Sequence, residues 1–110
     1  MSGRRIDFGS APLEIEAPGI AGRHADVDGT RWAIVTYEPG TLREEYCDEP
    51  HSGYVIGGSI AYEFEDGGEP LELGVTDAFT LAPGHPRHRG QAGEHGVTLF
   101  LIDAEVGHGG

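Results

Sequence analysis

Apolar and polar residues alternate with a period of two through the middle of the chain. The apolar positions of the segment 59–65 are Ile60, Tyr62 and Phe64. Because every second side chain of a strand lies on the same face, this segment is predicted to be a strand with one buried and one wet face. Asp66-Gly67-Gly68 follows it, and Asp-Gly tolerates the positive φ of tight hairpin turns. Leu71 and Leu73 resume the alternation, which predicts the return strand of a hairpin.

Two other segments, Arg31–Tyr37 and Val97–Ile102, carry apolar residues on both faces. In the second segment, Val97, Leu99 and Leu101 face one way, and Thr98, Phe100 and Ile102 face the other. A strand of this kind is buried on two sides. The pattern therefore places both segments either between packed sheets or in a subunit interface.

Glycine and proline interrupt the chain at short intervals, with 19 Gly and 7 Pro in 110 residues. The longest run without either, Val97–Val106, has ten residues. Strands of about 4–8 residues fit every run, whereas few runs are long enough for an ordinary helix. We therefore expect an all-β protein, a small antiparallel barrel or sandwich, with no helix longer than about two turns.

Composition narrows the classes of protein. The length of 110 residues fits one domain, 1–110, with a frayed tail at 107–110. The net charge of −12 and the absence of Lys argue against binding to nucleic acid or anionic membranes. A single cysteine excludes an internal disulfide, and the sequence shows neither a membrane-length apolar run nor a secretory signal. A cytoplasmic location is the expectation.

Residues that are able to carry chemistry form two clusters, Glu44–His51 and Pro83–His88. Cysteine and histidine four residues apart are able to ligate zinc, and on an extended strand Glu45 shares a face with Cys47. The structural alternative is that the acidic residues around Cys47 form a solvated sheet edge, and that the thiol is a small buried apolar group.

The order and spacing of these clusters resemble the cupin superfamily. Gly58 stands where the first cupin motif ends in glycine, and Asp77–Gly84 matches the strand and Pro-Gly turn of the second motif. Counting back from Gly58 puts His51 at the position of the motif's Glu, and Glu45-x-Cys47 at the position of its His-x-His.

In the second motif, Arg87 stands at the His position, between His85 and His88. The string Cys-x-x-Pro-His-x-Gly-Tyr-Val, followed by Pro-Gly-His, is also similar to small stand-alone bacterial cupins. The resemblance covers roughly residues 30–103. It implies a small antiparallel β-barrel (a jelly roll, or double-stranded β-helix) of two facing sheets. It also implies a divalent metal in the mouth of the barrel, as in many members, and a homodimer.

The candidate metal ligands are Cys47, His51, His85, His88 and Glu45. If the strand after the Pro-Gly turn is regular, parity points His85 inward and His88 outward, whereas a bulge after Pro86 reverses this. Thiolate, imidazole and carboxylate together suit Zn²⁺ best, with Fe²⁺, Mn²⁺ and Ni²⁺ as weaker candidates. The alternative is a metal-free pocket in which His51 and His85 hydrogen-bond to each other or to backbone.

Tyr54, Tyr62, Trp32 and Arg87 are the candidate substrate-binding residues, the aromatic ones for a ring or apolar group and the arginine for an acid. Their structural alternatives are core packing for two of the three aromatic residues and a surface position near Glu94 for Arg87. Two classes of function stay open. One is a metal-dependent enzyme acting on a small organic molecule. The other is a non-catalytic, metal-free small-molecule-binding module.

Overall fold

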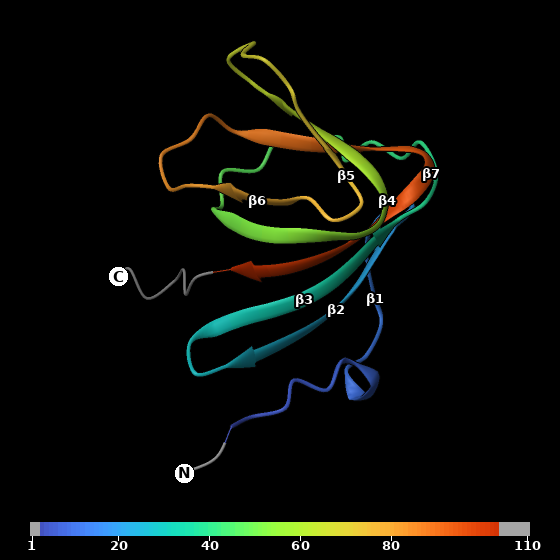
Figure 1. Cartoon of the computed structure of the whole chain (residues 1–110), viewed down its shortest axis with the longest axis vertical. Helices are drawn as coiled ribbons and strands as arrows, with labels where there is room; N and C mark the ends of the chain where they lie inside the picture. Colours follow the sequence, from blue (N-terminus) through green and yellow to red (C-terminus); the bar gives the residue numbers. More distant parts are fainter. Residues whose placement is uncertain (1–2, 104–110) are drawn as a thin grey trace.

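The structure, a computed structural model, describes residues 3–103, so the expected tail at 107–110 lies outside it. The elements are η1 (Phe8–Ser10), β1 (Glu14–Ala17), β2 (Ile20–Val27), β3 (Thr30–Tyr37), β4 (His51–Phe64), β5 (Leu71–Gly74), β6 (Ala78–Leu81) and β7 (His88–Asp103) (Figure 1). The predicted all-β class is confirmed, since the only helix in this part of the chain is a three-residue 3-10 turn. None of the described helical residues forms a span of membrane length.

The seven described strands form one antiparallel sheet in the order β1-β2-β3-β7-β4-β5, and β6 pairs with the first part of β4. The sheet bends back on itself, but its edge strands β1 and β5 do not pair, so the barrel is open. The predicted hairpin is present: Tyr62 of β4 pairs with Leu71 of β5. In its turn, the Asp66 carboxylate accepts a hydrogen bond of 2.8 Å from the backbone N–H of Gly68.

The bend lies within the two longest strands, β4 and β7 (Figure 1). They pair in two stretches, and the register shifts around Gly57 and Gly58 that separate them are β-bulges. Gly58 has a φ of 76°, and a Cβ built there would overlap the carbonyl oxygen of Gly96 on β7. Glycine is therefore required at this crossing, the position at which the cupin-like motif ends.

Alternate residues of the strands fill the concave side of the bent sheet. The buried apolar core consists of Ile20, Ala33, Val35, Tyr37, Val55, Ile60, Tyr62, Leu73, Leu81, Ala92, Val97 and Leu99. The predicted burial of Ile60 and Tyr62 on one face of their strand is confirmed. On the opposite, convex face Phe100 packs against Trp32 and Phe8, with ring centroids 6.1 and 6.4 Å apart.

Leu81→Ala is expected to lower the free energy of unfolding by about 2–5 kcal/mol, because Leu81 is buried in the core and truncation leaves a cavity. Thr80→Ala is the matched control, since Thr80 is exposed on the other face of the same strand. Its expected effect is below about 1 kcal/mol. Denaturant midpoints of the two variants measure the difference, and equal midpoints would contradict the assigned face of β6.

Candidate functional site

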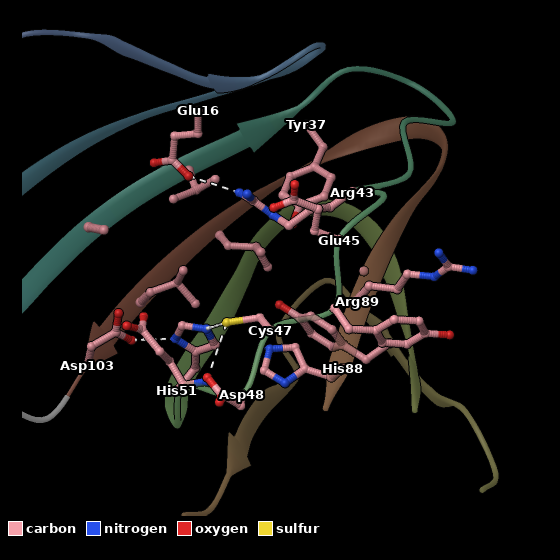
Figure 2. A pocket seen from close by; sticks show the side chains of 18 of the residues that line it. Glu16, Tyr37, Arg43, Glu45, Cys47, Asp48, His51, His88, Arg89 and Asp103 are labelled. Carbon is pink, nitrogen blue, oxygen red and sulfur yellow. Dashed lines mark hydrogen bonds and ion pairs between the residues drawn. The ribbon is translucent and has the colours of Figure 1, made fainter. Parts of the chain in front are cut away.

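A cavity of about 520 Å³ opens on the concave side of the sheet. Its wall combines core residues such as Leu99 and Leu101 with two separate groups of polar side chains. Figure 2 shows one group around Cys47, His51 and His88, and the other around Glu16 and Arg43 at a distance from it.

Cys47, His51 and His88 each place one potential ligand atom within 4.8 Å of the others. His51 is the first residue of β4 and His88 is the first residue of β7. Cys47 lies in the connection between β3 and β4, where its backbone N–H and C=O bond to those of His88 at 2.7 and 2.9 Å. The first residues of two strands and one residue of a connecting loop therefore lie close together.

The imidazole of His51 has a partner on each nitrogen. Its Nδ1 lies 2.7 Å from the Asp103 carboxylate, and its Nε2 lies 3.9 Å from the Cys47 sulfur (Figure 2). Burial lowers the pKa of His51, but the hydrogen bonds to Asp103 and Cys47 outweigh burial and raise the pKa to about 9. Because a carboxylate accepts hydrogen bonds, Nδ1 carries a proton and Nε2 is the nitrogen directed at the cluster.

His88 is held by a different partner. His85 Nδ1 lies 2.6 Å from the carbonyl oxygen of Ala82, and His85 Nε2 lies 2.6 Å from His88 Nδ1. A carbonyl only accepts, so in the neutral pair His85 Nδ1 donates to it, His85 Nε2 accepts, and His88 Nδ1 donates. His88 Nε2 is then left with a free lone pair. Burial, followed by the charges of His51 and His85, lowers the pKa of His88 to about 4, so its ring is neutral at pH 7.

Three of the five predicted ligands come together: Cys47, His51 and His88. The strand parity used to rank His85 over His88 does not apply, because β7 begins only at His88 and His85 lies in the turn before it. His88 is 2% exposed and His85 lies behind it.

Glu45 also lines the cavity, but it is exposed and outside the three-residue group. No strand runs through 43–46, so the expected shared strand face with Cys47 is absent.

Of the four predicted substrate-binding residues, only Tyr62 lines this cavity. Trp32 and Tyr54 lie on the convex face, because the inward positions of their strands are the neighbouring ones, Ala33 and Val55. Arg87 lies on the surface, which agrees with the alternative given for it in the sequence analysis. Its hydrogen-bonded partner is Glu65 rather than the expected Glu94.

Sequence reasoning missed Asp103 and Arg43. Asp103 follows directly after the predicted strand Val97–Ile102. An acidic residue at the end of an apolar strand could have marked it as a candidate site residue. Arg43 precedes four acidic residues at 44, 45, 48 and 49 and reads there as part of a charged surface segment. Only the fold shows that its side chain enters the cavity.

Comparisons with known proteins identify the fold. No protein-family model and no curated protein matches the chain. Among solved structures, a variant of the Bacillus subtilis oxalate decarboxylase superposes with a TM-score of 0.79 at 23% identity, covering 96% of this chain and 30% of that one. The present chain thus spans less than a third of that enzyme.

Two smaller proteins are matched over nearly their whole length. KdgF from Halomonas sp. gives a TM-score of 0.72 at 22% identity, covering 97% of this chain and 98% of that one. An RmlC-like cupin from Shewanella frigidimarina gives 0.73 at 14% identity, with coverages of 98% and 96%. The chain therefore has the cupin fold, as its motif spacing predicted.

The opposite pKa shifts of the two histidines predict a stability optimum for the metal-free protein. His51 has a raised pKa, so its contribution to stability is complete below pH 6.5 and is lost as the pH rises to about 9. His88 has a lowered pKa, so stability is lost as the pH falls from 6.5 to about 4.

Chemical denaturation across this pH range tests both effects. The stability difference between wild type and His51→Gln should shrink from pH 6.5 to 9, and the difference for His88→Gln should shrink from pH 6.5 to 4. Differences that do not vary with pH would contradict the two hydrogen-bonding arrangements.

Proposed function

We propose that the protein binds one divalent metal ion through Cys47, His51 and His88, and uses the adjacent cavity to hold a small organic molecule. The observation that carries the proposal is the convergence of three donor atoms within 4.8 Å from three separate parts of the chain. Both imidazoles also have their outer nitrogen fixed by a second residue, an arrangement common among histidine ligands of metals.

The donor set supports Zn²⁺ as the ion, because a thiolate with two imidazoles suits zinc better than it suits Mg²⁺, Ca²⁺ or Mn²⁺. Fe²⁺, Mn²⁺ and Ni²⁺ are the alternatives, and the oxalate decarboxylase with a similar fold has Mn(II) centres. Three protein ligands leave a coordination position for water or substrate. A thiolate ligand must stay reduced, which supports the cytoplasm as the location.

When bound, such an ion would supply Lewis acidity, polarising a carbonyl or acidifying a bound water. The chain's own residues determine how the ligands are presented. Asp103 keeps the proton of His51 on Nδ1, so that Nε2 is available. His85 does the same for His88, and Leu99 and Leu101 supply an apolar part of the cavity wall. His85 is thus proposed as a positioning residue rather than as a ligand.

A metal-free binding module is the second candidate, and one observation favours it. The bonds from His51 to Asp103 and Cys47 satisfy a charged imidazolium without any ion, which is why the pKa of His51 is raised to about 9. Metal binding then has to displace that proton.

The metal proposal predicts that His51→Ala and His88→Ala each abolish stoichiometric Zn²⁺ binding, and that Cys47→Ala weakens it by at least about tenfold, because each removes one of three ligands. His95→Ala is the matched control, since His95 is highly exposed and lies outside the site. Calorimetric titration with Zn²⁺, Fe²⁺, Mn²⁺ and Ni²⁺ measures the affinities, and the enthalpy should depend on the buffer because protons are released.

Wild-type protein that binds none of the four ions would refute the metal site and leave the binding module. Stoichiometric metal in a double Cys47→Ala, His51→Ala variant would instead show that the ion sits elsewhere.

We also propose that the protein is a homodimer formed through the convex face. Tyr54 and Ile56 are 41% and 48% exposed there, and Tyr54 pairs with Phe100 of the aromatic group on the same face. Exposed apolar patches of this kind often mark contact surfaces. Ile56→Lys is expected to yield a monomer in sedimentation equilibrium, whereas Glu72→Lys, an exposed change on β5, should leave the dimer intact. A wild-type protein that is monomeric at micromolar concentration would contradict the proposal.

A further inference from the structure

Arg43 enters the cavity from the connection between β3 and β4, away from the Cys47–His51–His88 group (Figure 2). Its guanidinium is fixed on two atoms. Nη2 donates to the Glu16 carboxylate at 2.9 Å, and Nε donates to the hydroxyl of Tyr37 at 3.4 Å. The backbone N–H of Arg43 also donates to the carbonyl of Gly90 at 3.0 Å. The arginine is therefore held by two side-chain hydrogen bonds and one backbone hydrogen bond.

The contacts of Arg43 leave donors unused. Nη1 has no hydrogen-bond partner in the part of the chain that the structure describes, and the side chain keeps 28% of its surface exposed in the cavity wall. Glu16 is also occupied on its other oxygen, which lies 2.6 Å from His24 Nε2. One carboxylate shared between an arginine and a histidine does not saturate a guanidinium, which has five N–H donors.

A buried or half-buried arginine with free donors fits a planar anion better than it fits a hydroxyl group, because two parallel N–H bonds match the two oxygens of a carboxylate. The cavity of about 520 Å³ is large enough for a small organic molecule that reaches from Arg43 toward the cysteine–histidine group. The two polar groups would then contact the two ends of one ligand.

We propose that Arg43 is the anchor for the carboxylate of a small organic acid, whose other end faces the Cys47–His51–His88 group. This assignment rests on the proposed function, because it names the class of molecule that the metal site would act on or bind. Glu16 and Tyr37 are the positioning residues that orient the guanidinium.

The acidic character of the chain opposes this ligand at long range. The net charge is −12, and Glu45, Asp48 and Glu49 also line the cavity. At physiological ionic strength, exposed charges farther away than about 8 Å are largely screened, whereas a direct charge-assisted hydrogen bond is not. Binding of an acid should therefore not weaken when salt is raised from low to physiological levels, unlike attraction to a basic surface patch.

The experiment compares acids with their neutral amides on the same protein. The probes are acetate, succinate and benzoate, each beside its amide, titrated calorimetrically into wild type and variants, both with and without added zinc. At least one acid should bind about tenfold or more tightly than its amide. Arg43→Met should remove that preference, because truncating a charged hydrogen-bond partner typically costs at least this much. Arg43→Lys, which keeps the charge without the planar fork, should lose an intermediate amount.

Arg87→Met is the matched control. It removes an arginine that is likewise paired with a glutamate, but on the surface outside the cavity, and it should bind the acid as wild type does. Acids and amides that bind equally, acids that do not bind at all, or an Arg43→Met protein with unchanged acid affinity would each overturn the assignment. If Arg43→Met does not fold, as judged by thermal unfolding, Arg43→Lys decides the question.

Titrating zinc into the same proteins separates this inference from the proposed function. Normal zinc affinity in Arg43→Met together with lost acid preference supports both. Normal zinc affinity with no acid preference in wild type overturns the role of Arg43 alone. Wild type that fails to bind zinc while it binds the acid in an Arg43-dependent way overturns the metal site and retains the anion anchor.

Discussion

The bend shared by β4 and β7 is the constraint on which the site depends. His51 begins β4 and Phe64 ends it, and Phe64 pairs with His88 at the start of β7. In a straight ladder, the 13 residue-to-residue steps from 51 to 64 would hold the two histidines roughly 40 Å apart. Their ring centroids are instead 5.2 Å apart. The bulges beside Gly58, and the absence of side chains where Gly58 crosses Gly96, allow the ladder to bend back on itself.

The same bend produces an asymmetry between the two histidines. His51 is hydrogen-bonded to Asp103, the last residue of β7, and this carboxylate stabilises the charged form of His51. His88 is buried and hydrogen-bonded to the imidazole of His85, and burial stabilises its neutral form. A metal ion entering the group would therefore compete with a proton at His51 but meet a free lone pair at His88. The metal-free state is a hydrogen-bonded arrangement in its own right, which explains why the same residues support both candidate functions.

The parts of the fold that depend on local pattern were predictable from the sequence. Period-two alternation identified the hairpin strands, and the Asp-Gly-Gly turn and Gly58 marked where the chain reverses or crosses. Cys47 and His51 were predictable as a pair because they are only four positions apart in the sequence. The choice between His85 and His88 was not, because parity applies only within a strand and Pro83–Arg87 is a turn. The prediction that Trp32 and Tyr54 line the pocket was wrong for a related reason. When both faces of a strand are apolar, the sequence does not show which of them lies on the concave side of the sheet.

Arg43 illustrates a stricter limit. The residues that follow it in sequence are acidic, but its partners in space are Tyr37 at the end of β3 and Glu16 of β1. Glu16 is 27 positions away in sequence, so only the fold brings it to Arg43. The acidic surroundings also act differently on the two ends of the cavity. They favour the approach of a cation to the cysteine–histidine group and oppose the approach of an anion to Arg43. A metal bound at the proposed site would reverse part of this opposition, since its charge would add to that of the guanidinium across the cavity. Because such coupling is reciprocal, a metal at the proposed site would strengthen the binding of an acid, and a bound acid would strengthen the binding of the metal by the same factor.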